Sequence, residues 1–486
     1  MARRGRDYID ALQARSPNLW LKGERVDDPT THPATKGVVQ SIAHLYDLQD
    51  DSDHQDALTY QAPNGERAGA SFLIPKTKED LQQRSAAYKT WANESLGLMG
   101  RTPDYLNAVL TAYGACADTF DDYADNVRNY YEFARNTDIC TTHALTNPQV
   151  NRAKSMTQQS EDDPYIPVGI VDERDDGVVV RGARMLATLP VADEILVLPS
   201  TVLKVEEGAD KYAVAFAIPT STEGLHFICR EPIAGDSKFD HPASSRFEEM
   251  DAICIFDDVL VPWERVFICR DVEAVNRAYT ATNALNHMAH QTVVHKVAKT
   301  EAFLGLVSLM AEGISVDVFG HVQEKIAEVI VYLEAMRGFW TRAEQEAEPN
   351  DYGLMVPNRG ALDGARNLYP MLYPRINEIV QQIGAGGMIL QLSERDLHGP
   401  LGEKVEKFMQ GRAMDAEAKM KLFRLAWDMT VSAFGARQTL YERFFFGDPV
   451  RMRMALFNSY DREPYRQRIR EFLDLEDEPI GKDAEG

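Results

Sequence analysis

Arg101 and Tyr105 are spaced so that their side chains can act together on a ligand. They lie four positions apart in the segment GRTPDYLN at residues 100–107, and Pro103 between them suits the first turn of a helix. A guanidinium and a phenol at the start of a helix form an electropositive, hydrogen-bonding corner that suits an anion. The alternative, which this spacing taken alone favours, is a surface arginine that covers a tyrosine ring.

A second segment, TTHALTNPQVNR at residues 141–152, carries one histidine and no carboxylate in a chain that is acidic almost everywhere. The histidine, His143, can accept or donate a proton near neutral pH. The segment ends at Arg152. Such a polar, uncharged strand and turn could be ordinary connecting structure, or it could hydrogen-bond a ligand that brings its own charge.

Several common cofactor and catalytic motifs are absent from the sequence. No G-x-G-x-x-G follows a predicted strand, and neither a P-loop nor a G-x-S-x-G is present. The GAGGM segment at 384–388 lies between helical stretches and favours a helix break or a close helix crossing. A redox cofactor, if used, is therefore not bound through a conventional dinucleotide-binding unit.

His287, His290 and His295 fall on one broad face of a predicted helix, but no carboxylate joins them at ligand spacing. We therefore expect no metal there and interpret them as interface or core residues. The cysteines are widely spaced and lack a C-x-x-C pair, which indicates free thiols in a reducing compartment. They are Cys116, Cys140, Cys229, Cys254 and Cys269.

The elements that must position these residues follow the order helices, strands, helices. Residues 1–138 predict helices at 81–96, 103–120 and 124–136. Residues 139–272 contain short β-rich runs, with a hairpin signal at 175–177, and predict a compact antiparallel β domain. Residues 273–486 predict a helical bundle with a long apolar-striped helix at 317–345 and an acidic tail. This α+β order is similar to the acyl-CoA dehydrogenase fold.

The composition restricts the possible partners. The chain has 486 residues, too many for one hydrophobic core, and a formal net charge of −23 with a pI of about 4.9. This charge disfavours nucleic acids and anionic membranes. Because no run of about 18 apolar residues occurs and no signal peptide is evident, we expect a cytoplasmic protein that spans no membrane.

Taken together, the two segments above, RGARMLATLP at 181–190, FDDVLVPWERVF at 256–267 and FFFGDPVR at 444–451 resemble one family. It is the flavin-dependent 4-hydroxyphenylacetate 3-hydroxylases, the large oxygenase component of two-component aromatic monooxygenases. The resemblance covers nearly the full chain. Each motif is weak alone, and their order and spacing together are specific.

The resemblance implies roles for particular residues. The reacting centre would be surrounded by Arg101, Tyr105 and His143, which would also bind the substrate. The residues implied in flavin binding are Thr146, Gln149, Val150, Asn151, Arg152, Thr188, Gly447 and Asp448. Ser200 and Thr201 would hold the side chain of the substrate.

The resemblance also implies a reaction. Reduced FAD, supplied as a diffusible co-substrate by a separate NAD(P)H-flavin reductase, would react with molecular oxygen to give a flavin C4a-hydroperoxide. This species would ortho-hydroxylate 4-hydroxyphenylacetate or a related phenol to a catechol. The family further implies a homo-oligomer, and we expect a homotetramer.

Alternatives stay open at this point. One is an acyl-CoA dehydrogenase-like flavin oxidoreductase, which needs a catalytic carboxylate from the C-terminal bundle. Another is an acidic helical scaffold that binds no flavin. The substrate could also be phenol, a halophenol, tyramine or a carrier-bound tyrosine. A related class with an iron–sulfur cluster, the 4-hydroxybutyryl-CoA dehydratases, is disfavoured because no cysteine follows Cys269.

Overall fold

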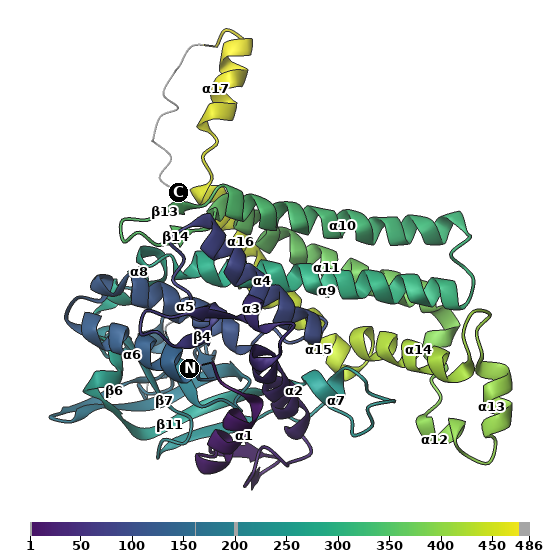
Figure 1. The fold of residues 1–486 in the computed structure, drawn as a ribbon. Helices are drawn as coiled ribbons and strands as arrows, with labels where there is room; N and C mark the ends of the chain where they lie inside the picture. The colour runs from purple at the N-terminus through teal and green to yellow at the C-terminus, as the bar shows by residue number, and fades with distance from the viewer. Residues whose placement is uncertain (1, 161, 199–202, 476–486) are drawn as a thin grey trace.

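The computed structural model describes residues 2–160, 162–198 and 203–475 of the chain. A sheet layer and the N-terminal helices form one side of the molecule, and long helices of the C-terminal half lie over them (Figure 1). The predicted α+β order of helices, strands and helices is confirmed. The division at 138/139 and 272/273 stays a prediction.

Six α-helices precede the central strands in the described part of the chain, and the fourth begins at a capping signal in the sequence. They are α1 (Gly5–Ala14), α2 (Lys36–Asp47), α3 (Gln55–Leu58), α4 (Lys78–Glu94), α5 (Pro103–Ala115) and α6 (Ala124–Thr137). Thr77 and Asp80 form a capping box at the start of α4, in which each side chain accepts from the backbone N–H of the other. The helices predicted at 81–96, 103–120 and 124–136 are confirmed as α4, α5 and α6, although α5 ends earlier than predicted.

Two sheets form the β part of the fold, with strand orders β2-β1-β10-β11-β7-β6 and β12-β9-β8-β5. The strands are β1 (Leu19–Leu21), β2 (Glu24–Arg25), β5 (Thr141–Ala144), β6 (Gly169–Arg174), β7 (Gly177–Thr188), β8 (Glu194–Val197), β9 (Val214–Pro219), β10 (Leu225–Cys229), β11 (Asp251–Pro262) and β12 (Val266–Cys269). The predicted hairpin is confirmed by the pairing of Arg174 with Gly177. Most neighbours are antiparallel, but β1–β10 and β5–β8 are parallel, which corrects the expectation of a purely antiparallel unit.

Short strands within residues 1–138 were not predicted. Strands β1 and β2 extend the larger sheet, and β3 (Thr59–Gln61) pairs with β4 (Arg67–Gly69) in a separate ribbon. Strands of two or three residues are too short to show the alternation that identifies a strand in a sequence. The N-terminal part is therefore joined to the central sheet by backbone pairing as well as by packing.

The C-terminal half is dominated by long helices. They are α8 (Val272–Ala281), α9 (Ala284–Gly313), α10 (Gly320–Gln345), α11 (Arg359–Ile389), α13 (Gly402–Met409), α14 (Ala416–Thr430), α15 (Ala433–Phe444), α16 (Pro449–Ser459) and α17 (Glu463–Phe472), with the single-turn helices α7 (Ser244–Phe247) and α12 (Glu394–Leu397) and the short strands β13 (Glu348–Pro349) and β14 (Met355–Val356). The long helix predicted at 317–345 is confirmed as α10. The helix break predicted in GAGGM is confirmed at Ala385, whose φ of 42° interrupts α11.

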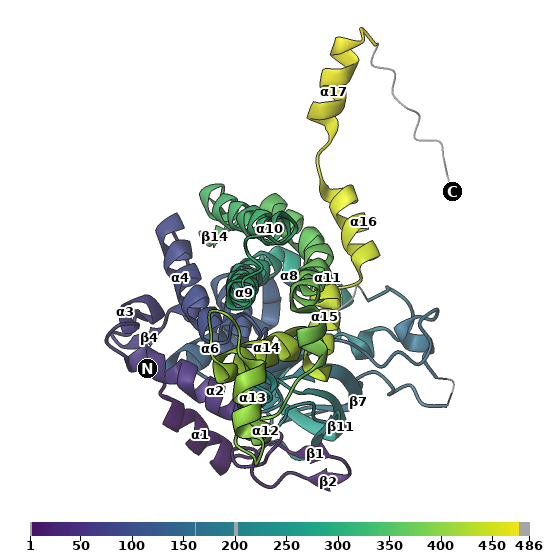
Figure 2. The same ribbon diagram turned by 90° about the vertical axis from the view of Figure 1, so that its right-hand side faces the viewer.

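Helix α9 lies at the centre of the bundle and contacts α4, α5, α10 and α11. Helices α16 and α17 form an arm, in which α16 contacts α11 and α17 extends away from the rest of the chain (Figures 1 and 2). No helix in the described ranges is long and apolar enough to cross a membrane.

Candidate active site

Arg101, immediately before α5, lies against two aromatic rings that contact each other edge to face, with their centres 5.7 Å apart. Its guanidinium carbon is 4.3 Å from the ring centre of Tyr105 and 4.4 Å from that of Phe445, which follows α15. The side-chain atoms Nε and Nη1 are shielded from solvent and have no hydrogen-bond partner. The backbone N–H of Arg101 donates to Glu249 Oε1 at 2.6 Å, which fixes the start of the helix against the sheet. The arrangement leaves a cation with unused donors inside an aromatic setting.

His143 joins this pair from strand β5. All four residues of β5 are buried, and the His143 ring centre is 5.6 Å from that of Tyr105. Its Nδ1 atom has no partner. Burial, assisted by the positive charge of Arg101, holds the pKa of His143 well below its usual value. The imidazole is therefore neutral near pH 7 and can accept a proton from a ligand. The structure thus brings together the three residues predicted to surround the reacting centre.

Side chains of α9 and α15 form a second layer next to the Arg101 cluster. The Tyr441 ring is 4.9 Å from the Phe445 ring, and its hydroxyl has no partner. A Cβ atom at Gly100 would stand 2.0 Å from that hydroxyl, so only glycine permits this approach. Glu442 pairs with Lys296 at 2.5 Å and also with Lys299, and all three are buried. Burial opposes the charge of Glu442, but the two ammonium groups lower its pKa. The Glu442 carboxylate is therefore ionised and paired with the two lysines.

Thr188, at the end of β7, belongs to a polar network beside β5. Its hydroxyl donates to Asp251 Oδ1 at 2.7 Å, and its carbonyl accepts from Thr142 at 2.6 Å. Asp251 is also held by Arg437 and Arg230. Burial opposes the charge of Asp251, but these guanidinium groups lower its pKa strongly. Because the single hydroxyl proton of Thr188 is engaged, this residue can only accept from a ligand.

The segment of predicted flavin residues that follows His143 begins at Thr146. The Thr146 carbonyl accepts from the Met185 backbone N–H at 2.7 Å, which ties this segment to β7. The exposed residues that follow it are Gln149, Val150, Asn151 and Arg152. Ser200 and Thr201, predicted to hold the substrate side chain, lie outside the described residues.

Gly447 and Asp448 lie at the junction of α15 and α16. Gly447 has a φ of 117° and lines a groove of about 310 Å³ together with Arg366, Phe446 and Met452. The Asp448 carboxylate caps α16 by accepting from two backbone N–H groups at 3.0 Å each. Asp448 therefore has a structural role at the start of α16, and its role in flavin binding stays a prediction.

Sequence reasoning missed three residues with unpartnered groups near this cluster. Arg184 of β7 is fully buried, and its Nε and Nη2 atoms bond nothing. The hydroxyls of Tyr113 on α5 and Tyr279 on α8 also lack partners, and their ring centres are 6.3 Å apart. Continuing the alternation of the buried Val178 and Val180 along β7 would have placed Arg184 on the inner face.

The histidines of α9 are core residues, as expected. His290 contacts Glu344 at 3.0 Å, and His295 contacts Asp104 at 3.2 Å, although no carboxylate lies at ligand spacing in the sequence. His287 faces Arg84, and burial holds its pKa well below the usual value. Across the described residues, no group of three or more histidine, cysteine or acidic side chains could hold a metal ion.

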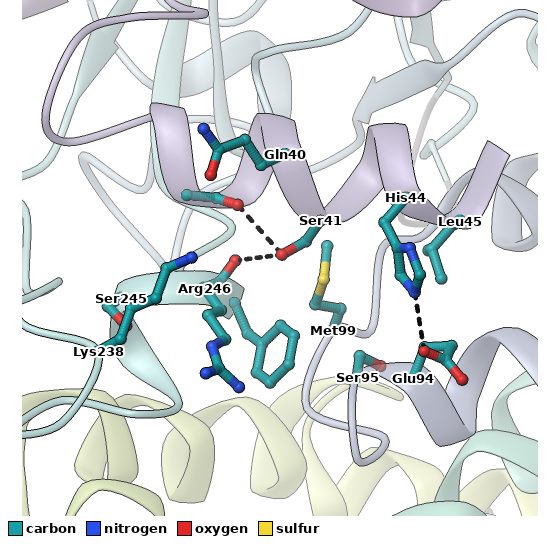
Figure 3. A pocket seen from close by; sticks show the side chains of 12 residues that line it. Gln40, Ser41, His44, Leu45, Glu94, Ser95, Met99, Lys238, Ser245 and Arg246 are labelled. Carbon is teal, nitrogen blue, oxygen red and sulfur yellow. Dashed lines mark hydrogen bonds and ion pairs between the residues drawn. The ribbon is translucent and has the colours of Figure 1, made fainter. Parts of the chain in front are cut away.

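A separate cleft opens on the N-terminal side of the molecule (Figure 3). It has a volume of about 300 Å³ and is lined by residues of α2, the end of α4 and α7, among them Ser41, His44, Glu94 and Arg246. None of the predicted site residues lines it. The candidate active site is therefore the buried cluster around Arg101 and not this cleft.

The cluster fits a flavin and a phenol by its chemistry. It offers unpartnered donors on Arg101 and Arg184, an unpartnered ring nitrogen on His143 and an acceptor on Thr188. Its rings provide flat apolar surface for a planar ligand. No side-chain carboxylate is bonded to the guanidinium of Arg101 within the described chain, so an electron-rich ligand oxygen has no competitor there.

Comparisons with known proteins agree with this chemistry. Residues 4–268 match the family described as 4-hydroxyphenylacetate 3-hydroxylase N terminal, and residues 275–474 match its C-terminal counterpart. The 4-hydroxyphenylacetate 3-monooxygenase oxygenase component of Thermus thermophilus is 66% identical over 474 residues, which cover 97% of this chain and 98% of the relative.

Solved structures give the same result. The crystal structure of a 4-hydroxyphenylacetate 3-monooxygenase oxygenase component complexed with FAD and 4-hydroxyphenylacetate superposes with a TM-score of 0.94 at 65% identity, covering 97% of this chain and 98% of that one. An archaeal 4-hydroxybutyryl-CoA dehydratase from N. maritimus has a TM-score of 0.89 at 20% identity, with 100% and 97% coverage, and shares the fold. The chain belongs to the 4-hydroxyphenylacetate 3-hydroxylase family.

Proposed function

We propose that this chain is the oxygenase component of a reduced-FAD-dependent aromatic monooxygenase. Its substrate is 4-hydroxyphenylacetate or a closely related phenol, which it hydroxylates beside the phenol oxygen to give a catechol. The observation that carries the proposal is the guanidinium of Arg101, which lies against the rings of Tyr105 and Phe445 with unused donors, near the neutral His143. The name of the Thermus thermophilus relative, which specifies 4-hydroxyphenylacetate, supports the choice of substrate.

Arg101 and His143 together activate the ring. A free phenol has a pKa of about 10 and is almost wholly protonated at pH 7. A guanidinium within hydrogen-bond reach lowers such a pKa by about 1–3 units, because it favours the anion. The unpartnered nitrogen of His143 accepts a hydrogen bond from the phenol hydroxyl, Tyr105 orients the oxygen, and Arg101 stabilises the negative charge that develops as the proton leaves. The resulting phenolate makes the adjacent ring carbon electron-rich.

Reduced FAD, when bound, supplies the electrons that activate molecular oxygen for insertion into the ring. The residues that would hold it are those of the segment from Thr146 to Arg152, Thr188 at the end of β7, and Gly447 with Asp448 beside α16. The Thr188 hydroxyl suits a ligand N–H because its own proton is bonded to Asp251. The burial of β5 and of the Tyr105 side chain keeps water from the phenol oxygen.

The reductant comes from a second protein. The chain carries no G-x-G-x-x-G fingerprint for a nicotinamide dinucleotide, so we propose that a separate NAD(P)H-flavin reductase delivers reduced FAD as a diffusible co-substrate. We further propose a cytoplasmic homotetramer. Because reduced FAD is the form that is used, the chain should bind it more tightly than oxidised FAD, which anaerobic titration of both forms would measure.

The direct test is an assay of phenols with the purified chain, a flavin reductase, NADH and FAD. The panel contains 4-hydroxyphenylacetate, phenol, a halophenol and tyramine, and products are identified by mass. We expect a mass gain of one oxygen and a catechol from 4-hydroxyphenylacetate, with none when either protein is omitted. Flavin oxidation with no hydroxylated product from any phenol would refute the proposal.

A further inference from the structure

Arg184 has one free edge on its guanidinium group. Its Nη1 donates to the Leu145 carbonyl at 3.1 Å and to the Asn147 side-chain oxygen. The remaining nitrogens, Nε and Nη2, are shielded from solvent and bond nothing. These two atoms direct their N–H bonds along the same edge of the planar group, which matches the two oxygens of a carboxylate or a phosphate.

Other arginines of this protein use the same edge to hold a carboxylate. In three pairs the arginine donates from both Nε and Nη2 to one carboxylate. The pairs are Arg181 with Asp258, Arg375 with Glu328, and Arg437 with Asp251. The Arg375 pair shows the geometry clearly, with both N···O distances at 2.8 Å. At these three arginines a carboxylate occupies the Nε–Nη2 edge. At Arg184 the same edge is free.

The chain does not complete the pair at Arg184. No carboxylate of the described residues lies within ion-pair distance of its guanidinium, and burial lowers its pKa to about 10. Arg84, which is equally buried, differs because it donates to the Tyr88 hydroxyl and faces His287, and none of its nitrogens is orphaned. A buried charge without a partner is costly, so a fold retains one only where something else compensates it.

Arg184 lies in the same region as the Arg101 cluster. Its two acceptors belong to the segment that follows His143 on β5. The hydroxyl of Tyr279 has no partner and interacts electrostatically with both Arg184 and Arg101. Both arginines therefore act on the Tyr279 hydroxyl, and we infer that a ligand held by Arg101 can extend toward Arg184.

We propose that Arg184 anchors an anionic oxygen group of a ligand in this site. The proposal rests on the proposed function for the identity of the ligands, which supply two sources of such a group. One is the carboxylate of an aryl-acid substrate, and the other is a phosphate of the flavin cofactor. In either case the Nε–Nη2 edge binds two oxygens, and Arg184 selects anionic ligands over neutral ones of the same shape.

The test compares charged and neutral ligands on the parent protein and on Arg184→Met. One arm measures 4-hydroxyphenylacetate against 2-(4-hydroxyphenyl)ethanol, which replaces the carboxylate with an alcohol. The other arm measures reduced FAD against reduced riboflavin under anaerobic conditions. Dissociation constants are read by calorimetry or flavin absorbance, so the result does not depend on turnover. Arg181→Met is the matched control, since it removes a surface arginine from the same strand.

In one arm, Arg184→Met should raise the dissociation constant of the anionic ligand by about ten- to hundredfold and that of the neutral ligand by less than threefold. Arg184→Lys should fall between Arg184→Met and the parent, because it keeps the charge and loses the fork. The arm that responds identifies the group. Equal weakening of both members of each pair, or unchanged constants in both arms, would overturn the proposal.

Two further measurements keep the outcome interpretable. If Arg184→Met does not fold, the parent must bind the anionic member of at least one pair at least tenfold more tightly than the neutral one, or the proposal is wrong. The catechol assay run beside the titrations separates the two claims. Catechol formation with unchanged binding would remove the anion site and leave the proposed function intact, whereas selective binding without catechol would do the reverse.

Discussion

At the scale of single residues, the site depends on a cation whose charge no carboxylate neutralises. The guanidinium of Arg101 packs against both Tyr105 and Phe445, and the backbone of Arg101 rather than its guanidinium is bonded to Glu249. A planar guanidinium can pack against both rings and present donors at fixed angles, whereas an ammonium cannot fill the same space or present two donors at a fixed angle. The charge and the shape of Arg101 therefore contribute separately.

Arg101→Lys should uncouple the reaction without unfolding the protein. A lost charge-assisted hydrogen bond costs about 1.5–3 kcal/mol, so hydroxylation should fall by about ten- to a hundredfold. Flavin oxidation should continue and hydrogen peroxide should replace catechol. The measurement is catechol formed per NADH oxidised, beside the melting temperature. A lower melting temperature with unchanged coupling would make Arg101 a structural residue only.

His143 links the site to the pH dependence of stability. Its pKa in the fold is held below the unfolded value, so the unfolded chain binds a proton that the folded chain refuses. Stability is thus present above about pH 6.5 and is lost as the pH falls. For one such histidine the loss between pH 7 and 6 is about 0.7 kcal/mol. His143→Asn should show a shallower decline in melting temperature over this range.

His287 provides a second case of the same kind. His287→Asn should resemble His143→Asn, because burial lowers the pKa of His287 in the same direction. Identical slopes for the parent and His143→Asn would mean that His143 is protonated in the folded protein.

Part of the site could be predicted from sequence and part could not. Arg101 and Tyr105 are neighbours on one helical turn, so their proximity follows from local geometry. Phe445 approaches Arg101 from more than 300 positions away, and no local rule brings them together. Arg184 was missed for a different reason, since an arginine in a strand is usually a solvated residue and only its missing partners reveal it.

At the scale of elements, long periodic helices were predictable and short strands were not. Helix α10 repeats its apolar positions over 26 residues, whereas β1 and β2 offer three and two residues. The path of the chain between helices could not be predicted from local sequence either. Between α4 and α5 the chain turns at Gly97, whose φ is 66°, and packs directly on α9.

Gly97→Ala should therefore destabilise the protein. A Cβ atom at this position would stand 2.7 Å from the backbone nitrogen of Lys299, and the positive φ adds strain. Overpacking of this kind costs about 1–3 kcal/mol. Gly305→Ala is the control. Gly305 lies within α9, where an added Cβ atom would have no neighbour within 4 Å, so this change should stabilise the protein by about 0.5–1 kcal/mol. The measurement is the melting temperature of each variant. An unchanged melting temperature for Gly97→Ala would mean that the turn can move to accept the Cβ atom.

At the scale of the whole molecule, the arm formed by α16 and α17 contacts α11 through α16, while α17 extends away from the bundle (Figure 2). Neither helix has a buried residue. Large apolar side chains are exposed along it, including Phe457 at 62% and Phe472 at 82%. An arm of this kind is stabilised when another molecule covers it.

The expected homotetramer gives the arm such a partner. Light scattering should report an assembly larger than the 54.6 kDa monomer. The double variant Phe457→Ser and Phe472→Ser should shift the assembly toward smaller species, because it removes apolar surface from the arm. Val205→Ser, which changes an equally exposed loop residue, should leave it unaltered. A parent protein that is monomeric at micromolar concentration would contradict this prediction.

The unneutralised arginines inside an acidic chain have a kinetic consequence. The formal net charge is −23 at pH 7, while Arg101 and Arg184 present positive charge only in the interior. Anionic ligands must therefore approach against long-range repulsion before they reach the attractive groups. Added salt, which shortens the Debye length to about 8 Å at 0.15 M, should accelerate their capture. Stopped-flow mixing should show association rates that rise with ionic strength for reduced FAD and 4-hydroxyphenylacetate, and rates that stay flat for neutral phenols.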